Sequence, residues 1–366
     1  MISSRPVAVT GLGCLCAAGT NLAACLDHLF RGARPPQPPS RFTSGHPVRY
    51  PVFEVTAELP GSDQLSRTAR LAMAAAREAV ADAGWQPADL AGRRVGVIVG
   101  TTVGSAMNNE DFYAAYLQGQ EPVMTQIERF LGSNPATAVA RDLGLNGPCQ
   151  TVVNACSSGT DAVGLAAAWI RAGDCDLVLA GGADELCRIT YNGFISLMIT
   201  DEAPVRPFDR RRKGLNRGEG AAFLLLEAEG VRPGQRPRAF VAGYGSACDA
   251  HHLTAPHPEG EGLKRALAEA LAQSGATPAD LAFVNAHGTG TPDNDRVECR
   301  TLAATLPGIP FLSTKGYTGH TLGACGAIEA AFTVACLQRG EVPANAGFGE
   351  ADPLLPATPV TANTLV

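Results

Sequence analysis

The sequence predicts an α/β protein built from two similar halves. Short apolar runs alternate along the chain with longer segments that have helical periodicity. Runs in which nearly every residue is apolar are typical of strands that helices cover on both faces. The order strand, glycine-rich turn, helix and strand occurs near the N-terminus and again from residue 238 onwards. These observations indicate an internal two-fold repeat of one α/β unit.

In the first half, one long helix and several strands can be placed from their patterns. The helix is predicted over residues 65–85, where an apolar stripe would pack against a sheet. The stripe consists of Leu71, Ala75, Ala79 and Val80. Strands are predicted at residues 7–14, 93–102, 176–185 and 220–229.

The second half starts again with a predicted strand and glycine-rich turn at residues 238–252. A helix is expected over residues 261–275 and another, rich in small residues, over 323–340. Strands are expected at residues 281–291 and 310–315. The second half therefore repeats the order of the first.

Composition limits the class of protein. The chain has 366 residues, of which 45% are hydrophobic, and a net charge of −6, so it can bury a large core and has no basic excess for nucleic-acid binding. No apolar run is long enough to span a membrane, and the N-terminus has no pattern of a secretory signal. The 11 cysteines are an odd number. Several lie in apolar segments, which favours reduced, buried thiols in a cytoplasmic protein; these include Cys14, Cys16, Cys175, Cys325 and Cys336.

Cys156 lies where the sequence predicts a sharp turn from a strand into a helix. Val152 and Val153 end an apolar run, and small apolar residues follow from Ala162 onwards, as in a tightly packed helix. The positive end of a helix favours the thiolate, which is the nucleophilic form of cysteine. A buried structural cysteine is the common alternative. The local pattern leaves both interpretations open.

Three other segments suggest sites, but a structural role is the stronger interpretation for each. The sequence "GLGCLC" at 11–16 resembles a dinucleotide-binding loop, yet Cys16 stands where the third glycine is needed. The sequence "CDAHHLTAPHP" at 248–258 gathers one cysteine and three histidines without the Cys-x-x-Cys pair of common zinc sites. The basic run "RPFDRRRKG" at 206–214 is typical of a solvated loop.

Two histidines lie in glycine-rich loops that follow predicted strands. His287 is part of "VNAHGTGTPDNDRVE", and His320 is part of "STKGYTGHTLGACGAIEA". Ligand sites of α/β proteins lie at the carboxyl ends of strands. Cys156, His287 and Lys315 all fall at such ends, which favours a shared functional region.

Together with "NACSSG", "RPFD…GEG" and "TAPHPEGEG", these segments resemble the β-ketoacyl synthases, the decarboxylating condensing enzymes of fatty-acid and polyketide assembly. The resemblance is to the branch with a Cys-His-His triad and covers the chain from about residue 6 to residue 366. It implies the thiolase fold, a five-layered αβαβα sandwich of two pseudo-repeated halves, here residues 1–235 and 236–366. His320 argues against the initiating synthases, which use asparagine at this position.

The resemblance assigns chemical roles to the triad. Cys156 would accept an acyl group from an acyl carrier protein, because a thioester requires a soft nucleophile. His287 and His320 would hold the malonyl thioester and support its decarboxylation, their N–H groups stabilising the enolate. The implied reaction is a decarboxylative Claisen condensation that gives a β-ketoacyl carrier protein.

The resemblance also assigns supporting residues. Lys315 would lie near the second histidine, with Glu298 as its ion-pair partner, and Glu329 corresponds to a buried glutamate of the family. Thr289 and Thr291 would bind the phosphopantetheine arm. No metal and no cofactor is expected on this chain, since the phosphopantetheine is carried by the acyl carrier protein.

Two protein partners are implied. The family forms homodimers or pairs with a homologous chain, and residues 101–112 would help to shape the acyl pocket. The carrier protein is acidic, so it would dock on a basic patch. Possible members of this patch are Arg67, Arg70, Arg206, Arg210, Arg211 and Lys213.

The family pattern continues past a strand such as "PVTANTLV" into a Gly-Phe-Gly-Gly loop, and the sequence ends at Val366, where that loop would begin. The loop supplies an oxyanion donor, whose loss would lower the rate by about 100- to 1000-fold. Two alternatives to an active synthase therefore stay open. They are a non-condensing partner subunit, similar to a chain-length factor, and an acyltransferase that uses Cys156 without decarboxylation. The intact Cys-His-His set favours the synthase.

Overall fold

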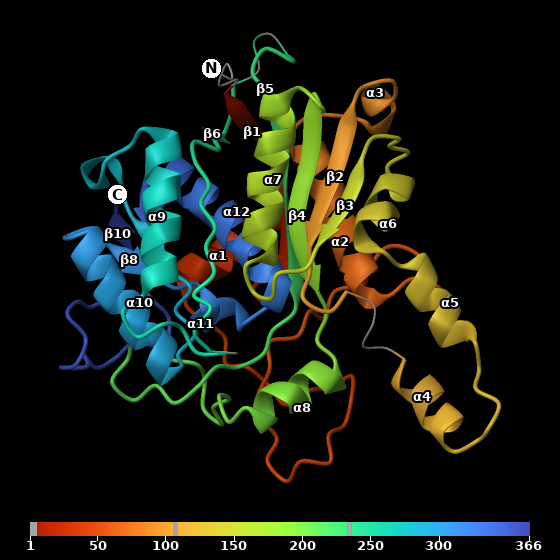
Figure 1. Ribbon diagram of the computed structural model, residues 1–366, viewed down its shortest axis with the longest axis horizontal. Helices are drawn as coiled ribbons and strands as arrows, with labels where there is room; N and C mark the ends of the chain where they lie inside the picture. The colour runs from red at the N-terminus through yellow and green to blue at the C-terminus, as the bar shows by residue number, and fades with distance from the viewer. Residues whose placement is uncertain (1–5, 105–108, 233, 235, 253) are drawn as a thin grey trace.

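The computed structural model describes residues 6–104, 109–232, 234, 236–252 and 254–366. Its main element is a six-stranded mixed sheet with the order β3-β2-β4-β5-β1-β6 (Figure 1). Strands β2, β3 and β4 are parallel, whereas β1 and β5 run antiparallel to their neighbours. The strands are β1 (Val7–Cys16), β2 (Val95–Gly100), β3 (Cys149–Val152), β4 (Leu177–Asp184), β5 (Gly220–Ala228) and β6 (Ala239–Phe240).

Helices cover both faces of this sheet. Helices α2 and α6 pack on one face, and α7 and α12 pack on the other. The predicted stripe of the long helix is buried against the first of these faces, so this prediction is confirmed. The first-half helices are α1 (Leu22–Arg31), α2 (Arg67–Asp82), α3 (Pro87–Leu90), α4 (Glu110–Leu117), α5 (Thr125–Gly132), α6 (Pro135–Asp142), α7 (Ser158–Ala172) and α8 (Arg188–Ser196).

The glycines of "GLGCLC" serve the packing of α2 on β1. Both lie inside β1, and a Cβ atom at Gly11 would come within 2.1 Å of the carbonyl oxygen of Ala79. A Cβ atom at Gly13 would come within 2.0 Å of the carbonyl oxygen of Ala75. The glycines therefore allow the helix backbone to touch the sheet, and the segment is not a dinucleotide-binding loop.

The second half adds two further layers on the far side of α12. Leu312 of β8 and Val342 of β9 pack with Cys336 of α12, and helices α9 and α10 lie outside these strands (Figure 1). The resulting order of layers is α, β, α, β, α, as the resemblance implies. The second-half elements are α9 (Glu261–Ser274), β7 (Val284–Asn285), α10 (Pro292–Thr305), β8 (Phe311–Leu312), α11 (Lys315–Thr318), α12 (Cys325–Arg339), β9 (Glu341–Val342) and β10 (Thr364–Leu365).

The strand predicted at the start of residues 238–252 is present but short. Among the described residues of this segment, the two residues of β6 form a ladder, and they pair with β1 of the first-half sheet. Beyond them, side chains of α9 accept the backbone N–H groups. Gln273 accepts from Tyr244 at 3.2 Å, and Glu269 accepts from Ser246 at 3.2 Å. These bonds take the place of the ladder that a strand would need.

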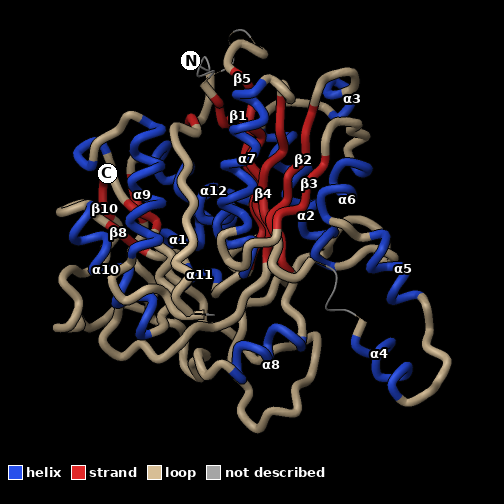
Figure 2. The backbone as a smooth tube through the Cα atoms, viewed as in Figure 1, coloured by secondary structure: helices blue, strands red, loops and turns tan. Residues whose placement is uncertain are grey.

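Helices α4 and α5 project away from the sheet as an arm that the sequence did not predict (Figure 2). The side chains of Leu117 and Leu131 on this arm are 82% and 73% exposed. Residues 105–108, which fall within the predicted pocket segment 101–112, lie outside the described residues. Residue 235 does so too, so the boundary predicted between residues 235 and 236 stays a prediction. No helix of the described ranges is long and apolar enough to cross a membrane.

Candidate active site

Cys156 occupies the predicted turn between β3 and α7. Ala155, directly before it, has a φ of +47°, which is a strained conformation for a residue with a Cβ atom. Ser158 holds the turn, because its hydroxyl donates to the carbonyl oxygen of Ala155 at 2.7 Å and accepts from the N–H of Asn154 at 2.8 Å. Part of the Cys156 surface faces solvent, and the thiol lies before the first turn of α7, at its positive end.

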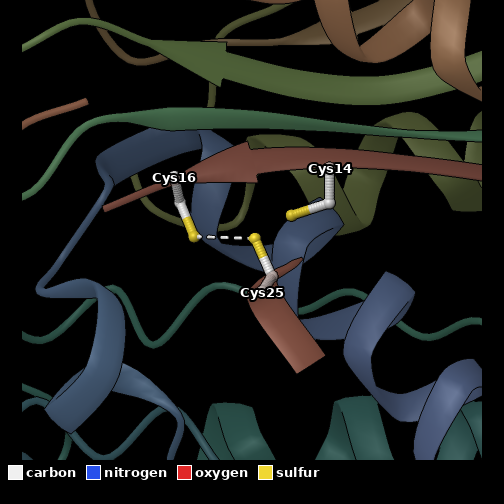
Figure 3. A group of neighbouring side chains, drawn as sticks. All are labelled: Cys14, Cys16 and Cys25. Atoms are coloured by element: carbon white, nitrogen blue, oxygen red, sulfur yellow. Dashed lines mark hydrogen bonds between the residues drawn. The ribbon is translucent and has the colours of Figure 1, made fainter. Parts of the chain in front are cut away.

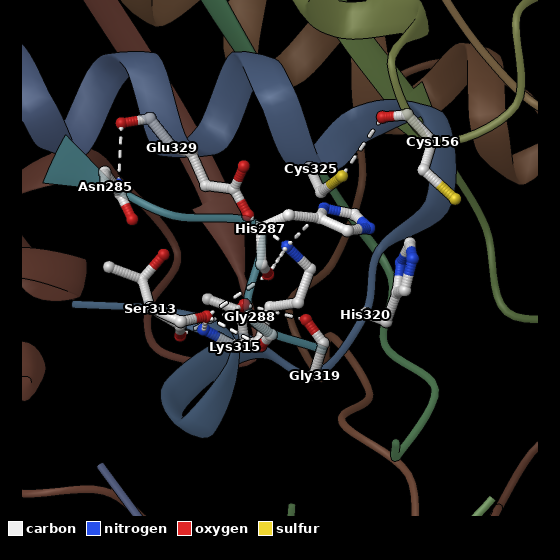
Figure 4. A network of polar contacts seen from close by, with 12 residues as sticks. Cys156, Asn285, His287, Gly288, Ser313, Lys315, Gly319, His320, Cys325 and Glu329 are labelled. Carbon is white, nitrogen blue, oxygen red and sulfur yellow. Dashed lines mark hydrogen bonds and ion pairs between the residues drawn. The ribbon is translucent and has the colours of Figure 1, made fainter. Parts of the chain in front are cut away.

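The structure brings Cys156, His287 and His320 together. The Cys156 sulfur and one ring nitrogen of each histidine all lie within 4.8 Å of one another. The two imidazole rings are nearly perpendicular, with centroids 5.2 Å apart (Figure 4). The first half of the chain thus supplies the thiol and the second half supplies both rings.

Hydrogen bonds fix the tautomers of both histidines. Nδ1 of His320 accepts the N–H of Leu322 at 3.0 Å, and Nδ1 of His287 lies 3.1 Å from Nζ of Lys315, which can only donate. The proton of each neutral ring must therefore be on Nε2. Burial, and then the charge of Lys315, lowers the pKa of both histidines well below its ordinary value. The site therefore holds two neutral rings whose Nε2–H groups have no hydrogen-bond acceptor among the described residues.

Lys315 is held by Glu329 and not by Glu298. Its ammonium group is 2.5 Å from Oε1 of Glu329 and donates to the carbonyl oxygen of His287 at 2.6 Å. Burial lowers the pKa of Lys315, but Glu329, Cys325 and Glu298 together outweigh burial and keep the pKa above its usual value. Burial raises the pKa of the Glu329 carboxyl group, and Lys315 opposes this shift.

The predicted ion pair between Glu298 and Lys315 is therefore wrong. The Glu298 carboxylate accepts the backbone N–H groups of His287 at 2.6 Å and Gly288 at 2.7 Å instead. These two bonds satisfy the charge in place of a lysine. Glu298 thus fixes the backbone of the loop that carries His287.

Thr289 and Thr291 follow His287 on the same loop. Their hydroxyl oxygens are 2.8 Å apart and form a hydrogen bond with each other. Thr289 is buried, whereas Thr291 is partly exposed. Their role in binding phosphopantetheine stays a prediction.

Two of the arginines predicted to dock a carrier protein are bound within the chain. Arg67 donates to both carboxylate oxygens of the buried Glu219, at 3.0 and 2.9 Å. Arg70 donates to Asp63 at 2.9 Å and to the carbonyl oxygens of Leu59 and Pro60. These bonds hold both guanidinium groups in place within the chain, and docking through Arg67 and Arg70 stays a prediction.

The other predicted basic residues lie in the loop 206–213. Arg206 is partly buried, and Arg211 and Lys213 are exposed. The side chain of Arg210 is 58% exposed and pairs with Glu350 at 2.7 Å. Docking through this loop stays a prediction.

The histidine-rich segment 248–258 forms no metal site within the described ranges. No group of three potential ligands there includes Cys248, His251, His252 or His257. Nδ1 of His252 accepts the N–H groups of Thr254 and Ala255, both at 3.1 Å. This ring nitrogen therefore stabilises a turn.

Sequence reasoning missed Arg217, a buried cation beside the triad. Its Nη1 donates to the carbonyl oxygen of His320 at 2.6 Å, and its guanidinium carbon lies 4.7 Å from the ring centroid of Phe194. Nε and Nη2 have no hydrogen-bond partner among the described residues. Burial lowers the pKa of Arg217 to about 10. A single arginine before "GEG" gives no sequence signal for such a position.

Two more residues, Cys325 and Asp184, support the nucleophile's turn. The Cys325 thiol donates to the carbonyl oxygen of Cys156 at 3.2 Å (Figure 4). The buried Asp184 accepts from the Thr101 hydroxyl at 2.6 Å and from the N–H of Gly323 at 2.7 Å. Asp184 therefore joins loops of the first and second halves beneath the triad.

The Cys156 thiol experiences opposing influences. Burial raises its pKa, and the charges of Lys315 and Arg217 lower it in part. The net direction is upward, in contrast to the lowered value that the helix terminus suggested from the sequence. The two cations nevertheless stabilise the thiolate once it forms.

A cavity of about 290 Å³ lies beside the turn. Its walls come from the loop after β2, the end of α5 and strand β3, and Thr102 of this wall donates to the carbonyl oxygen of Ala155 at 3.0 Å. The lining residues are Thr101, Thr102, Val103, Gly104, Phe130, Leu131, Asn134, Pro135, Thr151 and Val153.

Comparison with family models and curated proteins gives consistent matches. The model of the β-ketoacyl synthase N-terminal domain matches residues 52–230, and that of the C-terminal domain matches residues 238–349. The tetracenomycin polyketide synthase ketoacyl synthase alpha subunit of Streptomyces glaucescens is 33% identical over 96% of this chain and 89% of that protein. A 3-oxoacyl-[acyl-carrier-protein] synthase 2 of Staphylococcus aureus is 32% identical over 93% of this chain and 88% of that protein.

Solved structures give the same result. The ishigamide ketosynthase/chain length factor matches with a TM-score of 0.93 and 30% identity, over 100% of this chain and 94% of that one. A chain of AntDE:AntF, a type II acyl-carrier protein in complex with its ketosynthase bound to the hexaketide, matches with a TM-score of 0.89 and 26% identity, over 99% and 94%.

Proposed function

Because this chain belongs to the β-ketoacyl synthase family and has its thiolase fold, we propose that it condenses malonyl carrier protein with an acyl group held on Cys156. The product is a β-ketoacyl carrier protein of fatty-acid or polyketide assembly. One observation carries the proposal: Cys156 and two neutral histidines lie within 4.8 Å of one another. Cys156 serves the transfer of the acyl group, and the two histidines serve the decarboxylation.

In the first step the Cys156 thiolate attacks the thioester carbonyl of an acyl carrier protein. The acyl group moves to the Cys156 sulfur, and the phosphopantetheine thiolate leaves and takes the proton that Cys156 gave up. Lys315 and Arg217 support the thiolate electrostatically. The cavity beside Ala155 receives the acyl chain.

In the second step malonyl carrier protein loses CO₂ and forms an enolate. The new negative charge lies on the thioester oxygen and needs donors that are already in place. The Nε2–H groups of His287 and His320 supply them, since the Nδ1 atom of each ring is already bonded. Lys315 holds His287 in this tautomer and is itself anchored by Glu329.

In the third step the enolate carbon attacks the acyl-Cys156 carbonyl. A carbon–carbon bond forms, the carbon–sulfur bond to Cys156 breaks, and the thiolate is regenerated. The reaction consumes one malonyl thioester and one acyl thioester and releases CO₂. The phosphopantetheine stays on the carrier protein throughout, and Thr289 and Thr291 bind it.

The partners follow from the same proposal. The chain works with an acyl carrier protein and pairs with a second copy or a homologous chain, as solved relatives do with a carrier protein and a chain length factor. The exposed apolar arm of α4 and α5 is available for such a pairing.

A cytoplasmic location fits the 11 cysteines, all of which are unpaired. The intact triad favours an active synthase over a non-condensing partner.

Intact-protein mass spectrometry tests the first half-reaction. The full chain is mixed with acyl carrier proteins of several chain lengths, and Cys156→Ala is the matched control. We expect an acyl adduct that the control lacks, followed by a carrier-bound product two carbons longer when malonyl carrier protein is added. An adduct without elongation would favour an acyltransferase. No adduct, even with a homologous chain present, would refute the proposal.

A further inference from the structure

A second cluster of thiols lies away from the active site. Cys14 and Cys16 of β1 and Cys25 of α1 form one group in which all three sulfur atoms lie within 4.8 Å of one another (Figure 3). The residues are between 0% and 3% exposed. Nothing in the condensation chemistry uses them.

Local geometry explains why the three thiols meet. Cys14 and Cys16 are two residues apart on β1, so their side chains point to the same face of the sheet. Cys16 and Gly19 exchange two backbone hydrogen bonds of 3.0 and 3.1 Å, which turn the chain back toward α1. A Cβ atom at Gly19 would lie 2.5 Å from the N atom of Cys25, so the glycine permits this close approach.

Cys16 and Cys25 are the pair best placed to react. Their sulfur atoms are 3.7 Å apart, and the Cys25 thiol lies 3.5 Å from the carbonyl oxygen of Gly19. A disulfide needs about 2.05 Å between sulfurs, which requires a small rotation of each side chain. Cys14 and Cys16 are separated by about 6.6 Å along the strand, near the limit for a disulfide.

The surroundings favour an uncharged product. The three cysteines belong to a buried apolar core that also contains Leu29, Ile328 and Phe332. A divalent metal with three thiolates would leave a net negative charge in this core, whereas a disulfide is neutral. The three sulfurs also leave a tetrahedral metal without a fourth ligand from the described residues.

We propose that Cys16 and Cys25 form a redox-sensitive disulfide when the protein meets hydrogen peroxide. The Cys16 thiolate attacks one peroxide oxygen, the O–O bond breaks, and the released hydroxide leaves as water after taking the thiol proton. The Cys25 thiol then attacks the sulfenic sulfur, the S–S bond forms, and a second water leaves. Two thiols lose two electrons, and one peroxide is reduced to two waters.

Two features support this chemistry. Hydrogen bonds from Cys14 and Cys25 lower the pKa of the Cys16 thiol well below its ordinary value, so Cys16 is the member of the group that loses its proton most readily. Burial excludes large reagents, and peroxide is small and uncharged.

Peptide mass spectrometry tests the proposal. The folded full chain is treated with peroxide, its free thiols are alkylated in urea, and it is digested with trypsin without reduction. No lysine or arginine lies between Cys14 and Cys25, so one peptide carries all three cysteines. We expect this peptide to have one alkylated cysteine and a mass lower by two hydrogens, and dithiothreitol to restore three alkylation sites.

Cysteine variants identify which two residues form the disulfide. Cys25→Ser, or Cys25→Ala if the serine does not fold, should abolish it, and Cys14→Ser should keep it. Cys175→Ser, another cysteine of the same core at 1% exposure, is the matched control and should change nothing. Three alkylated cysteines after peroxide treatment of the wild type, an equal yield of disulfide without Cys25, or a bound metal ion in place of the bridge would each overturn the proposal.

Discussion

The two sides of the active site differ in how far this chain completes them. The turn that carries Cys156 lies next to β3 at the edge of the sheet, and Val153 beside it is 65% exposed. The loops that carry the histidines are more deeply buried, with His320 at 2% and Lys315 at 1% exposure, although His287 is partly exposed. The first half thus presents a nucleophile beside an open edge of the sheet, and the second half presents a mostly buried group around His320 and Lys315.

This difference indicates which task each half performs within one chain. Stabilising an enolate requires donors fixed in a low-dielectric environment, and the ion pair of Lys315 with Glu329 fixes them inside the second half. Acyl transfer requires access for a long substrate, and the open edge with the arm of α4 and α5 provides it. The proposed partner chain would cover this edge.

The largest expected effect concerns the buried ion pair. Lys315→Met leaves the Glu329 carboxylate buried without its cation, so we expect about 3–5 kcal/mol of lost stability in urea unfolding. Arg188→Met is the matched control, because its ion pair with Glu110 is on the surface and contributes about 1 kcal/mol or less. Equal losses in both variants would contradict the division into an open and an interior side.

The histidines should separate the two half-reactions. Either His287→Ala or His320→Ala removes one donor to the enolate, and we expect decarboxylation to fall by about 100- to 1000-fold. Transfer of an acyl group to Cys156 should be much less affected. Single-turnover assays of each half-reaction measure both, with His252→Ala as the control on an exposed ring. Parallel losses of the two half-reactions would refute separate roles.

The pH dependence should differ between the two sides. Both histidines have a lowered pKa, so they stay neutral and decarboxylation should be constant between about pH 6 and pH 8. Cys156 has a raised pKa, so its alkylation by iodoacetamide should accelerate as pH rises through the same range. A decarboxylation rate that falls with acid near pH 6.5 would show that a histidine titrates there.

The lowered pKa of each histidine also predicts that folding stability decreases as pH falls. A histidine whose folded pKa is depressed contributes stability above the unfolded pKa of about 6.5, and this contribution is lost as pH falls. Unfolding midpoints measured from pH 7 downward should therefore decrease, and His320→Ala should reduce this slope. An unchanged slope in the variant would contradict the neutral state of the ring.

Arg217 should affect the nucleophile moderately. Arg217→Met removes a positive charge that stabilises the Cys156 thiolate, so alkylation at a fixed pH should slow by less than about tenfold. Arg210→Met, on the exposed loop, is the matched control. If Arg217→Met left the alkylation rate and its pH profile unchanged, Arg217 would have only a packing role.

Cys325 should give the smallest effect. Cys325→Ala removes one weak bond to the Cys156 carbonyl oxygen, which corresponds to a change in acylation rate of about fivefold or less. Cys325→Ser keeps a donor at this position and should retain more of the rate. An alanine variant faster than the serine variant would contradict this role.

The sequence predicted what depends on local pattern. Long apolar runs and the stripe of α2 identified the first sheet and its covering helix, and loop motifs identified Cys156, His287 and His320. It did not predict how short the strand at the start of residues 238–252 is, because the side chains of Gln273 and Glu269 accept the backbone N–H groups of Tyr244 and Ser246 beyond it. Which partners bind those N–H groups is decided by tertiary packing.

The partners of the supporting residues also depend on tertiary packing, so the sequence could not predict them. Glu298 and Glu329 both lie on helices near Lys315, and only the structure assigns the ion pair to Glu329. Arg217 has no sequence neighbours that mark it. The pairing of Cys25 with Cys16 depends on how α1 lies on β1, which no spacing rule gives.

Release of CO₂ from malonyl carrier protein by matched variants tests the central claim most directly. The account predicts that Cys156→Ala, which cannot be acylated, still releases CO₂, while His287→Ala and His320→Ala accept an acyl group but release CO₂ about 100- to 1000-fold more slowly. If CO₂ release were lost with Cys156 and retained without the histidines, the assignment of the two half-reactions to the two sides of the site would be wrong.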